Sequence, residues 1–154
     1  VSVEKNSFND STIVTFLLYG ILKIPDIEYR IENFYINITC SMESIDISLQ
    51  SRDPRFSSFD RGIVYYNNSK KMNHAISVVT RVDKDKSFIS YWDTRKDFGV
   101  PYNQQPSEFI GNLMGSHSLM FGIPRRYNDE SMLASFITVG LSDALKPWRE
   151  VCGL

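Results

Sequence analysis

Hydrophobic and polar residues alternate along much of the chain, which is the period of a half-buried β-strand. In the segment NFYINITC, every second side chain from Phe34 to Cys40 is apolar, and Asn37 lies on the opposite predicted face. Similar alternation, or a run of β-branched residues, predicts about eight short strands. They fall at residues 11–18, 33–40, 44–50, 61–67, 75–82, 87–93, 118–124 and 133–140.

Two segments have the 3.6-residue spacing of a helix instead. The first, residues 104–115, has Pro106 in its first turn and Gly115 where a left-handed residue would end it. The second is the final stretch, LSDALKPWREVCGL, whose apolar stripe includes Cys152. A helix that begins one or two residues into this stretch keeps Pro147 in or just past its first turn, where proline is tolerated.

These elements predict a mainly β protein. The short polar turns at residues 41–43 and 83–86 favour antiparallel pairing of the strands that they join. About eight short strands with two short helices, one at the C-terminus, are typical of an antiparallel β-sandwich or an open barrel. The 154 residues contain no repeat, linker or low-complexity segment, so we expect a single β-rich domain over residues 1–154.

Charge and hydropathy narrow the range of partners. The formal net charge is -1, and acidic and basic residues are interspersed along the chain. We therefore expect no nucleic-acid partner and no polybasic membrane anchor. The longest apolar runs are too short and too interrupted to form an embedded membrane segment. Other proteins remain as the expected partners.

The two cysteines, Cys40 and Cys152, both lie on apolar faces of predicted elements. Free thiols of a cytosolic protein are one interpretation. The other is a disulfide that fastens the last helix to an early strand, which would place the protein in an oxidising compartment. The chain begins at Val1 rather than methionine, as a processed or trimmed chain would.

Motifs for catalysis, metal binding and cofactor binding are not found in the sequence. The two histidines, His74 and His117, are not part of any metal-ligand spacing, and no phosphate-binding glycine motif occurs. His117 lies between Ser116 and Ser118, but neighbours on a strand point to opposite faces, which disfavours a catalytic serine-histidine pair. We expect no enzyme, no cofactor and no metal.

Aromatic and basic side chains predict a possible interaction surface instead. Two groups contribute: the loop residues Arg125, Arg126 and Tyr127, and the outward-facing tyrosines Tyr66 and Tyr91. The alternative for the loop is that the acids that follow it neutralise its arginines in a solvated hairpin.

The order of the segments along the chain is also informative. A serine and an Asp-Ser pair precede the first apolar strand, and a strand that ends in cysteine follows. Next come a strand with arginine, a charged turn, a strand with tryptophan and a helix that begins with proline. The residues concerned are Ser7, Asp10, Ser11, Cys40, Arg81, Trp92 and Pro106. The chain closes with Gly-Leu, Asp-Ala-Leu, Pro, Arg-Glu and a final Cys-Gly at Cys152 and Gly153.

This succession covers essentially the whole chain and resembles the type VI secretion system accessory proteins called TagO or VasI. The resemblance implies a non-enzymatic protein of the bacterial periplasm, exported by a signal peptide absent from this chain, that acts through contacts with other proteins. It also implies that Cys40 and Cys152 form the disulfide of that family. The family provides no catalytic residues to carry over.

Two other functions fit a small, exported β-rich protein. The first is a periplasmic immunity or inhibitor protein that neutralises a toxic effector. The second is a cell-wall-active hydrolase, which would require a polar cleft that joins a histidine to a carboxylate or a serine.

Overall fold

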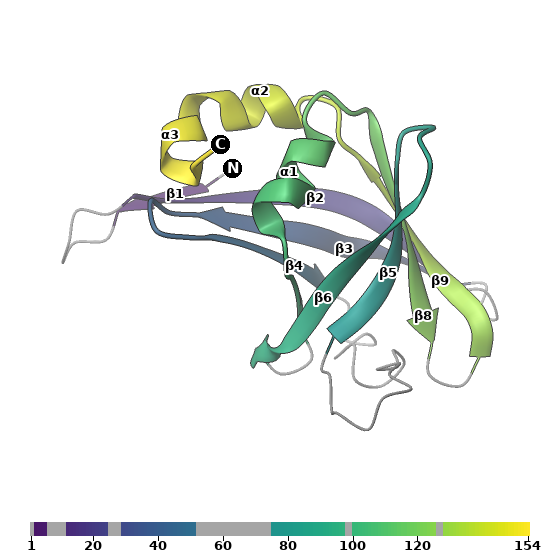
Figure 1. Ribbon diagram of the computed structural model, residues 1–154. Coiled ribbons are helices and arrows are strands. Elements are labelled where there is room, and N and C mark those ends of the chain that lie inside the picture. Colours follow the sequence, from purple (N-terminus) through teal and green to yellow (C-terminus); the bar gives the residue numbers. More distant parts are fainter. Residues whose placement is uncertain (1, 6–11, 25–28, 52–74, 98–99, 126–127) are drawn as a thin grey trace.

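The computed structural model describes residues 2–5, 12–24, 29–51, 75–97, 100–125 and 128–154 (Figure 1). Most of these residues lie in strands. The strands are β1 (Ser2–Lys5), β2 (Thr12–Ile24), β3 (Tyr29–Cys40), β4 (Ile45–Ser51), β5 (Ala75–Val82), β6 (Phe88–Asp97), β7 (Val100–Asn103), β8 (Ser118–Arg125) and β9 (Asn128–Ile137). The helices are α1 (Pro106–Leu113), α2 (Leu141–Leu145), the 3-10 turn η2 (Lys146–Trp148) and α3 (Arg149–Cys152).

The strands form an antiparallel barrel. The order along the sheet is β1-β2-β3-β4-β7-β6-β5-β8-β9, and β9 also pairs with β2. Eight strands therefore form a closed ring, and β1 lies outside it on the first half of β2. The predicted mainly β class, with two helical regions and one of them C-terminal, is confirmed, and the architecture is a barrel rather than a sandwich.

Ring closure depends on Gly20. On one side Gly20 pairs with Phe34 of β3, and on the other it pairs with Phe136 of β9. A Cβ atom on Gly20 would overlap the ring of Phe136 and would lie 2.6 Å from the carbonyl oxygen of Ser135. A glycine at this position lets the ring of a bulky neighbour pack directly against the backbone of β2.

We expect Gly20→Ala to weaken the closure between β2 and β9. The added methyl group must displace backbone as well as the Phe136 ring, and overpacking of this kind typically costs about 1–3 kcal/mol. Equilibrium denaturant unfolding would measure the loss. The matched control is Gly122→Ala on β8, where the new Cβ would lie at an ordinary 3.5 Å from the nearest side-chain atom, so that variant should be near neutral.

Trp92 lies at the centre of the core and is completely buried. Its ring packs edge-on against Phe109 of α1 (centroids 5.5 Å apart) and Phe121 of β8 (5.6 Å). Its indole N–H donates to the hydroxyl of Ser90, which is itself 2.6 Å from the hydroxyl of Thr80. Helix α1 therefore packs its apolar face into the core, and the buried hydroxyl groups satisfy the one polar atom of Trp92.

The C-terminal stretch forms short helical segments rather than one helix. Leu141, Leu145 and Cys152 are buried, so the apolar stripe predicted from the sequence does face the core. Pro147 lies in the 3-10 turn that separates α2 from α3, because proline has no N–H for a regular helical hydrogen bond. Figure 1 shows these segments over β1 and β2, and α3 contacts β2.

Several boundaries differ from the sequence-based prediction. β1 and β7 were not predicted, since each has only four residues. β2 extends to Ile24 and β3 starts at Tyr29, beyond the predicted ends. β9 starts at Asn128, within a predicted loop, because its pairing with β8 continues to Arg125 and overrides the low strand propensity of the polar residues there. The strand predicted at residues 61–67 lies outside the described residues.

Candidate functional site

The two cysteines form a disulfide, as one of the two sequence interpretations predicted. Their Cα atoms lie 4.9 Å apart, and the bond joins the end of β3 to the end of α3 across 112 residues of sequence. Cys40 is fully buried and Cys152 nearly so. Neither cysteine is free, so neither is available as a nucleophile or a metal ligand.

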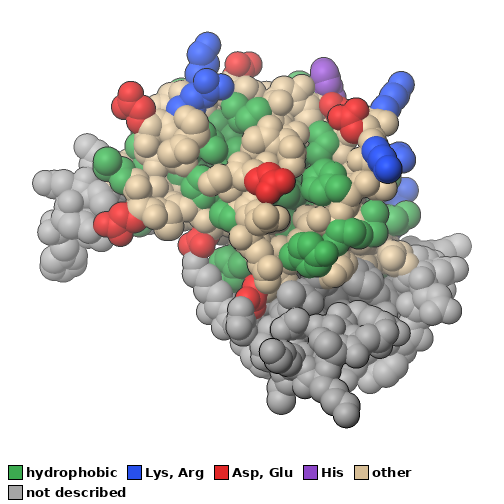
Figure 2. Space-filling view, in the orientation of Figure 1, with side chains coloured by type: hydrophobic (Ala, Val, Ile, Leu, Met, Phe, Trp, Pro, Cys, Tyr) green, Lys and Arg blue, Asp and Glu red, His purple; other side chains and the backbone are tan. Residues whose placement is uncertain are grey.

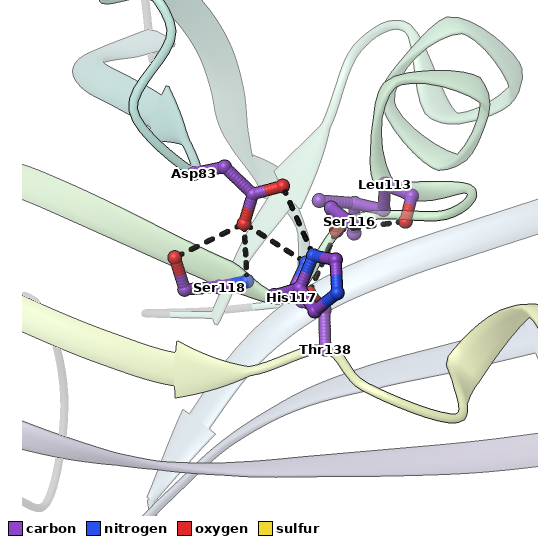
Figure 3. A network of polar contacts seen from close by, with 6 residues as sticks. All are labelled: Asp83, Leu113, Ser116, His117, Ser118 and Thr138. Atoms are coloured by element: carbon purple, nitrogen blue, oxygen red, sulfur yellow. Dashed lines mark hydrogen bonds and ion pairs between the residues drawn. The ribbon is translucent and has the colours of Figure 1, made fainter.

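The exposed His117 belongs to a polar cluster at one end of the barrel (Figure 3). Asp83, in the turn after β5, accepts hydrogen bonds from the backbone N–H groups of His117 (2.9 Å) and Ser118 (2.7 Å). It also accepts a bond from the Ser118 hydroxyl (3.2 Å) and lies 3.7 Å from Nδ1 of His117. Beside them, the hydroxyl of Ser116 donates to the carbonyl of Leu113 (2.8 Å) and lies 2.7 Å from the hydroxyl of Thr138.

This cluster joins three connecting segments of the fold. Asp83 belongs to the turn between β5 and β6, Ser116 to Ser118 lie between α1 and β8, and Thr138 lies between β9 and α2. The carboxylate bonds to both the histidine and a serine, and neither serine hydroxyl bonds to the imidazole of His117. The geometry is that of a structural clasp, and it lacks the serine-histidine hydrogen bond of a nucleophilic triad. His74 lies outside the described residues.

Hydrogen bonds to the charged form hold the pKa of Asp83 below its ordinary value. The largest cause is the bond from the backbone N–H of His117; bonds from Ser118 and the charge of His117 act in the same direction, and desolvation opposes them. Because the folded-state pKa is lowered, the clasp stabilises the fold above the ordinary pKa of an aspartate. That contribution disappears as the pH falls through the lowered folded-state value.

We therefore expect Asp83→Asn to reduce stability at neutral pH and to flatten the dependence of stability on pH below about 4. Asn tolerates the left-handed backbone at this position (φ 50°), so the turn itself should persist. Denaturant midpoints measured from pH 2 to 7 would show the effect. Asp85→Asn, in the same exposed turn, is the matched control and should keep the wild-type pH profile.

The predicted interaction residues are only partly described. Tyr91 is on β6, and about half of its surface is exposed (47%). Arg125 ends β8, where its backbone pairs with Asn128. Arg126, Tyr127 and Tyr66 lie outside the described residues. The structure therefore places Tyr91 on the outer surface, as predicted, and leaves the grouping of these five residues as a prediction.

A larger apolar surface lies on the outside of the barrel. Its side chains belong to four neighbouring strands and are exposed between 36% and 73%. We name this surface the outer apolar band; it comprises Val79 of β5, Ile89 and Tyr91 of β6, Met120 of β8, and Leu133 and Ile137 of β9. Exposed hydrophobic residues are normal when scattered singly, but a contiguous group indicates a binding surface.

Strand register places the outer apolar band on one face of the barrel wall. Ile89 lies opposite Val79, which lies opposite Gly122, and Gly122 in turn lies opposite Leu133. Met120 lies one row away, opposite Arg81. Directly opposed residues of an antiparallel pair project from the same face. These side chains therefore share the outer face, and Gly122 separates Val79 from Leu133. The sequence signal was present: segments 75–82 and 87–93 carry apolar residues at both odd and even positions, which a strand exposed on one face does not need.

Charged residues of both signs flank this surface. Arg81 lies beside the band on β5, and Lys23 lies opposite Leu133 on β2. Both side chains are exposed. On β6, Asp93 follows Tyr91 on the outward row of side chains, so an acidic residue borders the band at its other end.

Figure 2 shows the face that carries α1 and β6, where hydrophobic side chains reach the surface and an acidic side chain lies among them. A small open pocket lies on this face, between α1 and β6. Ile89 and Tyr91 line the pocket and also belong to the outer apolar band. The two features are therefore adjacent parts of one surface.

No family model, curated protein or solved structure matches this chain. Among the described helices, none is both long and apolar enough to cross a membrane. Across the described ranges, no group of three or more histidine, cysteine, aspartate or glutamate side chains is placed to hold a metal ion.

Proposed function

We propose that this chain is a non-enzymatic binding protein of the bacterial periplasm that serves a type VI secretion system as an accessory protein. It acts by docking another protein on the outer apolar band. The single observation that carries the binding role is the band itself: six partly exposed apolar side chains on adjoining strands of a closed barrel.

The periplasmic location and the assignment to a type VI secretion system are supported by different observations. A buried disulfide between elements far apart in the sequence is compatible with an oxidising compartment such as the periplasm. The assignment to a secretion system rests on the order of motifs that resembles TagO or VasI. Neither depends on the outer apolar band, so each part of the proposal can fail by itself.

An immunity protein that neutralises a toxic effector would use the same kind of surface. The identity of the bound protein separates the two functions. A photo-crosslinking amino acid at Val79, placed in the chain as expressed in the bacterium that carries its gene, should capture an envelope component of the secretion system. Capture of one toxic effector in a stoichiometric complex would replace the accessory role with the immunity role.

The control site for this experiment is Asp143, which is exposed on α2. A crosslinker there should capture much less of the same partner. Equal capture from both positions would contradict docking on the outer apolar band. Free thiols in protein recovered from cells would contradict the periplasmic location.

A further inference from the structure

The pocket beside the outer apolar band lies at a free edge of strand β6. β7 ends at Asn103, which pairs with Trp92, and no described strand continues along that edge to Ile89. The N–H of Gln104 donates to the carbonyl of Tyr91 (2.9 Å), so that carbonyl points toward the pocket side. Backbone groups alternate in direction along a strand, and the carbonyl of Ile89 therefore points to the same side.

The pocket has about 290 Å³ of empty space, including its open mouth. Its lining combines aromatic rings with polar side chains, among them Phe88, Tyr91, Phe109, Gln105, Glu108 and Asn112. Within the described part of the chain, the Glu108 carboxylate and the side-chain amides of Gln105 and Asn112 make no hydrogen bond or ion pair. Three polar side chains beside the aromatic rings of the pocket are therefore available to bind a ligand.

The negative charge of the pocket lining favours a cationic ligand. Glu108 is its one carboxylate, and no lysine or arginine lines the pocket. An anionic ligand would be repelled, whereas a cation gains a charge-assisted hydrogen bond. A guanidinium group offers five N–H donors in a planar fork and stacks on aromatic rings. The available acceptors are the Glu108 carboxylate, the carbonyl of Ile89 and the amide oxygens.

We propose that this pocket binds an arginine side chain of the protein that docks on the outer apolar band. The inference rests on the proposed function, because the band and the pocket share Ile89 and Tyr91 and one partner would cover both. The partner then carries an apolar surface, an acidic group near Arg81 and an arginine near Glu108. The opposite charges of Arg81 and Glu108 would then fix the orientation of the partner on the barrel.

The pocket can be tested without the partner. We would titrate the 154-residue protein with N-acetyl-arginine amide and follow backbone amide signals by NMR. Saturable shifts should be confined to residues 88–91 and 103–112. N-acetyl-citrulline amide, which has nearly the same shape but no charge, should bind about two- to five-fold more weakly, which is the worth of an exposed charge pair.

Glu108→Gln should weaken binding of N-acetyl-arginine amide by about two- to five-fold. Glu43→Gln, an exposed glutamate in the turn between β3 and β4, is the matched control and should leave binding unchanged. Equal binding of the citrulline compound, or an unaffected Glu108→Gln protein, would overturn the proposal. So would pocket shifts caused by N-acetylglucosamine and not by the arginine compound, because the site would then be a saccharide site.

Failure of this inference is distinguishable from failure of the proposed function. Crosslinking from Val79 would be repeated in a Glu108→Gln chain and in a Leu133→Asp chain. If the arginine pocket is real, both changes reduce capture. If capture falls in the Leu133→Asp chain alone, the band binds a partner and the arginine pocket is wrong. If neither change alters capture, both proposals are wrong.

Discussion

Replacing Cys152 by serine is expected to lower the free energy of unfolding by about 2–5 kcal/mol. The bond closes a loop with a sequence separation of 112 residues, and in the chain-entropy model a loop of about 100 residues gives close to 5 kcal/mol. Both sulfurs are also buried, so the serine hydroxyl would need a hydrogen-bond partner that an apolar neighbourhood does not supply. The loss should appear in denaturant unfolding followed by circular dichroism.

The reducing agent provides the internal control for this prediction. The wild-type protein should lose stability in reductant and approach the Cys152→Ser value, whereas Cys152→Ser and Cys40→Ser should not respond to reductant. A doubly substituted chain should resemble either single variant, because each removes the same bond. An unfolding midpoint of the wild type that reductant does not change would contradict a stabilising disulfide.

Trp92→Ala should have an effect of similar size, about 3–5 kcal/mol. The side chain is fully buried and packs against aromatic rings from a helix and from a neighbouring strand, so its removal leaves a cavity that rigid neighbours cannot fill. Trp92→Phe should lose less, because a ring remains and Ser90 keeps its contact with Thr80. Circular dichroism is the suitable probe, since the substitution itself removes one of the two tryptophans.

Tyr91→Ala is the matched control for Trp92→Ala. Tyr91 is the neighbouring residue on the same strand, and about half of its surface faces solvent. Exposed substitutions of this kind usually change stability by no more than about 0.5 kcal/mol. A similar loss in both variants would mean that β6 as a whole is being disturbed, and the buried position of Trp92 would not explain the result.

Much of the fold could be predicted because local patterns and tertiary burial agree. The side chains of Phe34, Ile36, Ile38 and Cys40 on β3 are buried in the core as the sequence predicted, although Tyr35 on the other face is buried as well. Gly115 has the left-handed backbone (φ 81°) expected at the end of α1. For β3 and for the end of α1, a short stretch of sequence contains the whole signal. The apolar faces that carry Cys40 and Cys152 also fitted free thiols, and their pairing was implied by the family resemblance.

The features that were missed depend on residues far apart in the chain. Barrel closure needs Gly20 opposite Phe136, and no local pattern states that register. The clasp needs Asp83 beside His117, which are 34 positions apart. The pocket needs residues 88–91 of β6 to lie beside α1. The outer apolar band was the one missed site with a local signal, in the apolar residues on both faces of β5 and β6.

The double pairing of β2 has a consequence for how the barrel assembles. β2 and β9 lie near opposite ends of the chain, so their seam is a contact of long sequence range and is expected to form late and slowly. Until it forms, the sheet has two unpaired edges that can associate with other chains. The disulfide joins β3, the neighbour of β2, to α3, which follows β9. Once oxidised, the disulfide keeps α3 beside β2 and β3, so β9 has a shorter effective loop to close when it pairs with β2. The time during which an open sheet can aggregate should therefore shorten.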